Sequence, residues 1–149
     1  NYGDSKIFEN NFQNSESVAV KTLDQLFYVD IKKKKPIKLI KCDAQGQELN
    51  IILGSRKIID TYKPFLYLEN DELNTSKTLI EKLKGMGYIM FWHLPPLYNP
   101  NNFLKNSKNI FPKIISCNML CIHQSTEIKL SEDWKRFKIK NSDDHPFKK

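Results

Sequence analysis

The sequence lacks most of the features that identify a function at once. Only 5 of its 149 residues are glycine, and they form no glycine-rich loop of the kind that binds phosphates or nucleotides. No apolar run approaches the roughly 20 residues of a membrane-spanning helix. The polar stretch 1–14 does not resemble a signal peptide. We therefore expect a cytoplasmic protein without a membrane partner.

Cysteine is also scarce. The three cysteines are odd in number, and Cys42, Cys117 and Cys121 lack the close paired spacing of a zinc site. A disulfide framework is therefore not expected. Free, buried and reduced thiols are the state that this pattern predicts.

The charge is strongly basic but not concentrated. The net charge is +7 and the pI is about 9.2, yet only the run 32–35 groups several lysines together. A basic balance suits anionic partners, but no basic motif interleaved with aromatic residues is present for stacking bases. We expect a solvated lysine-rich surface rather than a nucleic-acid interface.

Strands and helices alternate along the chain. This pattern predicts an α/β fold with mostly parallel strands. The last strand follows a long loop, about 94–112, instead of a helix, and we expect it to run antiparallel at an edge of the sheet. The expected strands cover 17–21, 37–42, 65–69, 88–92 and 114–122. We place one α/β domain at 1–123 and a polar tail with a short docking helix at 124–149.

Two acidic side chains end neighbouring strands. Asp43 follows the apolar strand 37–42, and Glu69 ends the next one. Ligands of open α/β sheets bind outside the carboxyl ends of strands. Two carboxylates there can share a proton or, with Asn70, bind a divalent metal. The plainer alternatives are a turn or helix-capping role for Asp43 and a helix-dipole role for Glu48.

A histidine and several aromatic residues mark the end of the third strand. His93 is placed to act as a general base for a hydroxyl nucleophile, or it is an ordinary loop histidine. Trp92, Tyr98 and Phe103 can line an acceptor pocket, as sugars often lie against such rings. The alternative is that these rings pack the long loop onto the sheet.

Several motifs occur in the order typical of one family. The chain resembles the FkbM-type family of S-adenosylmethionine-dependent methyltransferases over roughly residues 17–123. The resemblance rests on Val20-x-Thr22-Leu23-Asp24, Ile40-Lys41-Cys42-Asp43-Ala44-Gln45-Gly46-Gln47-Glu48, Pro64-Phe65-Leu66-Tyr67-Leu68-Glu69, Trp92-His93, Leu97-Tyr98-Asn99-Pro100-x-Asn102-Phe103 and Ser116-x-Asn118-Met119-Leu120-Cys121.

The chain departs from the family pattern in two ways. Gln45 stands where the family has glutamate, which preserves shape but removes a charge. The upstream glycine-containing cofactor loop and the acidic residue that holds the cofactor ribose are not found. The chain thus resembles the carboxyl-terminal half of a methyltransferase domain, with a partial Rossmann-like class I sheet.

The resemblance implies a transferase that moves a methyl group from S-adenosylmethionine, most simply to oxygen of a glycan or small-molecule hydroxyl. It implies catalytic roles for Asp43, Glu69 and His93, cofactor contacts from Asp43, Gln45 and Glu48, and substrate contacts from Trp92, Tyr98 and Asn99. A divalent metal is an open alternative. So is a non-catalytic binding module that kept the fold and forms homo-oligomers.

Overall fold

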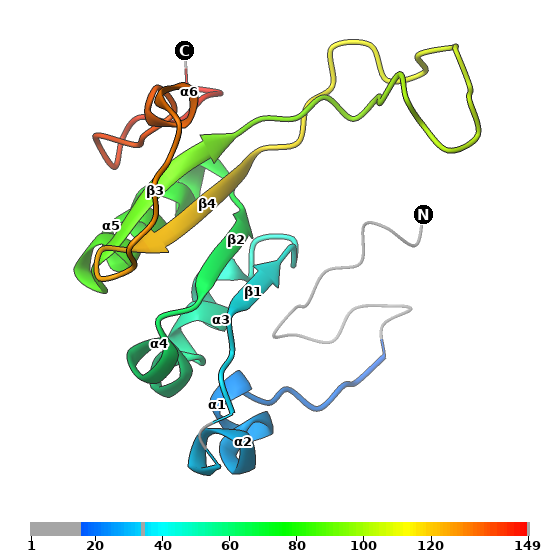
Figure 1. Ribbon diagram of the computed structural model, residues 1–149. Helices are drawn as coiled ribbons and strands as arrows, with labels where there is room; N and C mark the ends of the chain where they lie inside the picture. The colour runs from blue at the N-terminus through cyan, green and yellow to red at the C-terminus, as the bar shows by residue number, and fades with distance from the viewer. Residues whose placement is uncertain (1–15, 34, 149) are drawn as a thin grey trace.

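The computed structural model describes residues 16–33 and 35–148 as an α/β fold around one four-stranded mixed sheet (Figure 1). The strand order is β1-β2-β4-β3. β1 pairs with β2 in parallel, and β4 is antiparallel to both β2 and β3. The strands are β1 (Leu39–Cys42), β2 (Phe65–Glu69), β3 (Tyr88–His93) and β4 (Asn118–His123).

The last strand is antiparallel, as expected, but its position at an edge was predicted wrongly. β4 lies between β2 and β3, and β3 forms that edge of the sheet. The crossover from β2 to β3 leaves room for one strand, and the long connection after β3 lets the chain return into that gap. Three strands therefore point the same way, although only one of the three pairings is parallel.

The helices are short apart from α5, which packs on β3. Among the residues that the structure describes, no helix is both long and apolar enough to cross a membrane. The helices are α1 (Leu23–Leu26), α2 (Tyr28–Lys32), α3 (Glu48–Leu53), α4 (Arg56–Tyr62), α5 (Leu73–Gly85) and α6 (Glu132–Lys135).

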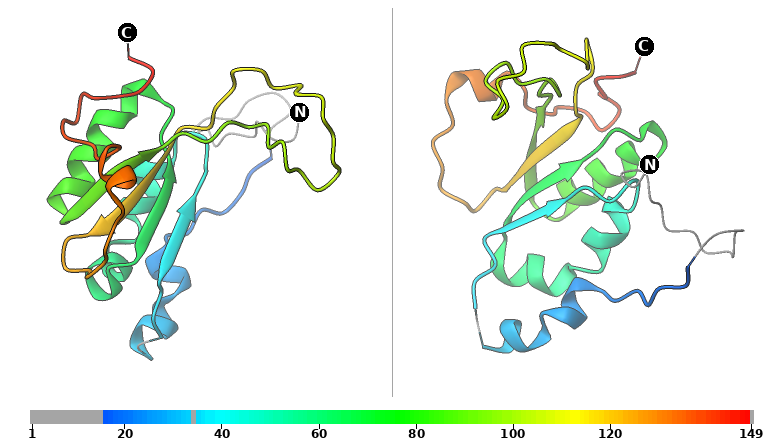
Figure 2. Two further views of the ribbon diagram at one scale, coloured as in Figure 1. Left: turned by 45° about the horizontal axis from the view of Figure 1, so that its top comes forward. Right: turned by 90° about the vertical axis from the view of Figure 1, so that its right-hand side faces the viewer.

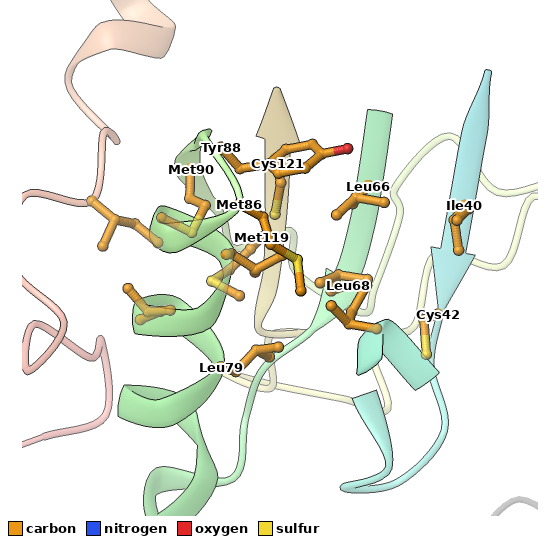
Figure 3. Packing of buried hydrophobic residues seen from close by; sticks show 14 of the residues in the cluster. Ile40, Cys42, Leu66, Leu68, Leu79, Met86, Tyr88, Met90, Met119 and Cys121 are labelled. Atoms are coloured by element: carbon orange, nitrogen blue, oxygen red, sulfur yellow. The ribbon is translucent and has the colours of Figure 1, made fainter. Parts of the chain in front are cut away.

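The core lies between the sheet and the helices that cover one of its faces (Figures 2 and 3). Alternate strand residues point to this face because side chains alternate across a strand. The strand residues of the core include Ile40, Cys42, Leu66, Leu68, Met90, Met119 and Cys121, and α5 adds Leu79, Ile80 and Leu83. The three cysteines are free and buried, as expected. Burial raises the pKa of Cys42 and of Cys117 to about 12.

The segment before α1 differs from the prediction. Residues 17–21 form no strand, and Val18 and Val20 are exposed. The alternation of valines is present, but no described strand lies beside them to accept backbone hydrogen bonds. The predicted helix start is confirmed, because the Thr22 hydroxyl accepts a hydrogen bond from the Gln25 N–H at 3.2 Å.

The segment after His123 packs against β3. The backbone N–H of Trp92 donates to the Phe137 carbonyl, and the backbone N–H of Ile139 donates to the Met90 carbonyl, both at 2.9 Å. Ile139 lies in the core at 3% exposure. Residues 137–139 therefore run along the outer edge of β3. The predicted short helix is α6, just before this stretch.

The contribution of this segment to stability can be measured. Ile139→Val removes one buried methylene and should lower the free energy of unfolding by about 1 kcal/mol. Ile128, which is 48% exposed, provides the matched control, and Ile128→Val should change it by less than about 0.5 kcal/mol. Urea unfolding followed by circular dichroism measures both. Equal effects of the two variants would contradict the docking of this segment in the core.

Candidate functional site

The carboxyl ends of β1 and β2 bring the predicted acidic residues together. Between β1 and α3 the chain makes a tight turn, in which Gln45 and Gly46 have positive φ values of 49° and 86°. Glycine adopts this conformation freely, whereas it is strained for glutamine. The turn places the Gln45 side-chain N–H₂ 3.4 Å from a Glu69 carboxylate oxygen. The expected proximity of the two strand ends is therefore confirmed.

Glu69 has an unusual protonation equilibrium. Partial burial, the negative charges of Asp71 and Asp43, and a hydrogen bond with Asp43 raise its pKa to about 7. Asp43 is itself half-exposed and pairs with Lys41 at 3.1 Å. Near neutral pH, the Glu69 carboxyl is thus protonated part of the time. Glu69 can therefore take up or release a proton in this pH range, and the carboxylates around it can attract a cation.

Glu48 holds the turn between β1 and α3 together. It is buried, and its carboxylate accepts a hydrogen bond from the Ala44 N–H at 2.8 Å. This bond closes the turn that carries Asp43 and Gln45. The negative charge of Glu48 also contributes to the raised pKa of Glu69. Glu48 therefore acts on the site by shaping the turn.

The acidic residues do not form a metal site. Among residues 16–33 and 35–148, no group of three or more histidine, cysteine or acidic side chains is arranged to hold a metal ion. Asn70, the predicted extra ligand, is buried and donates its side-chain N–H to the sulfur of Met119 at 3.2 Å. The donor set does not fit a divalent cation, and we derive no step through one.

His93 lies in a separate aromatic pocket at the end of β3. Its Nδ1 is 2.7 Å from the Tyr67 hydroxyl, and its ring lies 5.7 Å from that of Trp134. Burial raises the pKa of Tyr67, so its phenol stays protonated near neutral pH. The pocket has a volume of about 210 Å³. It is lined by Trp92, His93, Leu94, Pro95, Asp133, Trp134 and Phe137.

The acidic cluster and the histidine pocket lie on one face of the sheet. Asn118 of β4 is opposite both Glu69 of β2 and His93 of β3. Directly opposed residues in antiparallel strands point to the same face, and strands are spaced about 5 Å apart. Glu69 and His93 are therefore about 10 Å apart across the sheet. Asn118 of β4 lies between them on this face.

The predicted substrate residues do not come together. Trp92 is buried, and its indole N–H donates to the Asp144 carbonyl at 3.1 Å. Tyr98 and Asn99 lie in the long loop between β3 and β4, where the Tyr98 hydroxyl donates to the Asn106 carbonyl at 3.0 Å. This loop extends away from the sheet (Figure 1).

Sequence reasoning missed Tyr67, Asn118 and Trp134 as site residues. Tyr67 lies two residues before Glu69 and so shares its face of the strand, which is a signal that could have marked it. No local signal links Tyr67 to His93, because the contact spans β4. Trp134 was expected only as an anchor for the polar tail.

Comparison with family models gives a match. The family model for the Methyltransferase FkbM domain matches residues 1–90. This range contains β1, β2 and the acidic cluster, but it ends before His93. A comparison with curated proteins gave no match, and a comparison with solved structures gave none either.

The match corrects the extent of the resemblance. We expected it over 17–123, as the carboxyl-terminal half of the domain. The matched range is the amino-terminal part of this chain, so it supports the family but not the assignment to one half of its domain. The motifs after residue 90 lie outside it. The match covers more than half of the chain, and the chain therefore belongs to the FkbM methyltransferase family.

Proposed function

We propose that the chain serves S-adenosylmethionine-dependent methyl transfer to a hydroxyl of a glycan or small molecule, with Asp43, Gln45 and Glu69 on the cofactor side. The observation that carries this proposal is the acidic cluster inside the family match, where Glu69 and Asp43 approach each other at the carboxyl ends of two parallel strands. We place the reaction in the cytoplasm.

The cofactor suits this cluster because it carries a positive sulfonium, from which the methyl group is transferred when it is bound. A carboxylate whose pKa is raised by burial and by neighbouring carboxylates is stabilised in its charged form by a nearby cation. Asp43 and Glu69 would hold the charged part, and Gln45 would fix the carboxylate of Glu69 through its side-chain amide. Among the described residues, these three side chains form one wall of a cofactor site, and no glycine-rich loop forms another.

His93 is our candidate for the base. When the Nδ1–H donates to the Tyr67 hydroxyl oxygen, Nε2 is free to accept the proton of an acceptor hydroxyl. The Trp134 ring lies beside the imidazole, with ring centroids 5.7 Å apart. Methyl transfer depends mostly on positioning, and the aromatic pocket would provide it for the acceptor.

A titration tests the cofactor side. Because a single wall of the site binds weakly, we expect millimolar affinity. It is measured by NMR titration of the chain with S-adenosylmethionine and with S-adenosylhomocysteine, which lacks the sulfonium charge. S-adenosylmethionine should bind about fivefold more tightly than S-adenosylhomocysteine, because a partly exposed contact between opposite charges contributes roughly this much. Asp43→Asn should reduce this preference to about twofold or less. Glu127→Gln, an exposed carboxyl elsewhere, is the control.

Two results of this titration would contradict the proposal. A preference for the charged cofactor that survives Asp43→Asn would remove the cluster from the cofactor site. The absence of any chemical shift change with either compound at millimolar concentration would remove the cofactor from this chain.

A specific observation favours a second function, a binding module that self-associates. β1 pairs on one side only among the described residues, and a groove of about 450 Å³ lies beside it. Leu39 in this groove is 57% exposed. Unpaired strand edges invite pairing with another chain. Light scattering tests this function by measuring the molecular mass at increasing protein concentration. A chain that stays monomeric at high concentration would exclude self-association.

A further inference from the structure

The long connection between β3 and β4, residues 94–117, forms a defined arm. At its base the Leu97 N–H donates to the Ile114 carbonyl at 3.0 Å, and the Ser116 N–H donates to the Pro95 carbonyl at 2.9 Å. These bonds continue the β3–β4 pairing as a narrow ladder. The arm projects from the sheet away from the helices and the core (Figures 1 and 2).

The tip of the arm is held by an asparagine network. The Asn102 side chain donates to the Asn99 carbonyl at 3.0 Å and to the Asn106 carbonyl at 2.8 Å. Its oxygen accepts the Asn106 N–H at 3.0 Å. This network closes the turn around residues 103–105. The turn therefore has its own internal hydrogen bonds.

The closed turn presents apolar side chains outward. Phe103 is 97% exposed and Leu104 is 82% exposed. Further exposed apolar residues follow along the arm, namely Leu97, Ile110, Phe111 and Ile114. Scattered surface apolar residues are normal, but a group of this kind on one projecting element marks an interaction site.

The charge of the arm has a single sign. Lys105, Lys108 and Lys113 are exposed, and the sequence contains no aspartate or glutamate from residue 82 to residue 126. The acidic residues that balance lysines elsewhere in the chain are missing here. The arm thus combines an apolar tip with flanking positive charges.

We propose that this arm docks the chain on an anionic membrane surface. The tip, Phe103 and Leu104, enters the boundary between headgroups and acyl chains, and the three lysines lie at the level of the anionic headgroups. Apolar area and electrostatic attraction to anionic lipids together set the strength of such binding. Aliphatic side chains outnumber aromatic ones on the arm, which favours lipid over nucleic acid, where bases stack on rings.

This docking differs from the expectation of no membrane partner. That expectation rested on the absence of an apolar run long enough for a membrane-spanning helix, and surface binding needs no such run. The arm leaves the sheet directly after His93, so docking would hold the candidate site next to the bilayer. The proposal stands whether or not the chain is an active methyltransferase.

Vesicle sedimentation tests the proposal. The full chain should bind vesicles of phosphatidylcholine with about one third phosphatidylserine at low salt, and about 0.5 M NaCl should weaken this binding strongly by screening. Phe103→Ser with Leu104→Ser should lower the partition coefficient at least tenfold, since two apolar side chains lose their burial. Lys105→Glu with Lys108→Glu should lower it by more than about fivefold per lysine.

A matched control sits elsewhere on the surface. Ile128→Ser with Lys129→Glu replaces one exposed apolar residue and one exposed lysine outside the arm, so it makes one change of each kind, and it should leave binding unchanged. Circular dichroism should give the same spectrum for all variants. Equal loss in the control, or no binding of the wild-type chain to anionic vesicles, would overturn the proposal. So would retention of binding by the tip variant.

Two other partners are distinguished in the same experiment. Tip-dependent dimerisation in analytical ultracentrifugation without vesicle binding would show that a second copy covers the arm. Tight binding to a single-stranded oligonucleotide without vesicle binding would show a nucleic-acid surface. Either result overturns membrane docking.

Discussion

Replacing Trp92 with alanine should lower the free energy of unfolding by about 3–5 kcal/mol. The ring is 8% exposed and belongs to the core. It lies edge-to-face on His145 with ring centroids 5.3 Å apart. Truncation leaves a large cavity and removes the donor to the Asp144 carbonyl. Urea unfolding followed by circular dichroism measures the loss.

Two further variants separate the contributions of Trp92. Trp92→Phe keeps most of the ring volume but removes the indole N–H, and it should cost about 1–2 kcal/mol beyond the change in packing. Phe137→Ala alters another wall of the same pocket, but Phe137 is 49% exposed, so the expected loss is about 1 kcal/mol. If Trp92→Ala cost no more than Phe137→Ala, Trp92 would not be a core residue.

The case of Trp92 shows what a single sequence leaves open. Its position beside His93 suggested an acceptor pocket, and the ring does form one wall of the pocket. The sequence does not show that residues 137–145 fold back over β3 and bury the ring. That packing joins segments about 50 residues apart, and no local pattern encodes it.

Much of the sheet could be predicted because its strands carry local signals. β1 and β2 are short apolar runs bounded by proline and by carboxylates, and α5 has apolar residues at helical spacing. The place of β4 could not be predicted, because strand order depends on pairing between distant segments. Residues 17–21 have the alternation of a strand but lack a described partner.

Part of the candidate site could likewise be predicted from local sequence, and part of it could not. The approach of Asp43 and Glu69 could be predicted, since carboxyl ends of adjacent parallel strands meet at one edge. The turn in which Gln45 reaches Glu69 needs positive φ values at Gln45 and Gly46. The sequence indicates such a value only at Gly46, because glycine adopts it freely. The contact of Tyr67 with His93 required knowing that one strand separates them.

Glu69→Gln should make the chain more stable at pH 8 by about 2 kcal/mol, with little change near pH 4. The pKa of Glu69 rises from 4.5 to about 7 on folding, and each unit is worth about 1.36 kcal/mol. We reduce the resulting figure because the group is only partly buried and solvent screens it. Glutamine mimics the neutral form and can still accept the hydrogen bond from Gln45.

The sign follows from proton binding. The folded state holds its proton more tightly than the unfolded state, so Glu69 favours folding fully below pH 4.5 and loses this effect as the pH rises through 7. At pH 8 the wild-type chain bears the cost of a carboxylate beside Asp43 and Asp71. The difference between Glu69→Gln and wild type should therefore grow between about pH 4.5 and 7.

The pH dependence also separates an electrostatic cause from simple packing. Glu127→Gln removes an exposed carboxyl and should show no such growth. Asp43→Asn removes one of the charges that raise the pKa of Glu69, so in its background Glu69→Gln should gain less at pH 8. A gain that is equal at pH 4 and pH 8 would contradict the raised pKa. A gain that is unaffected by Asp43→Asn would show that burial and the other acidic neighbours, not Asp43, raise the pKa of Glu69.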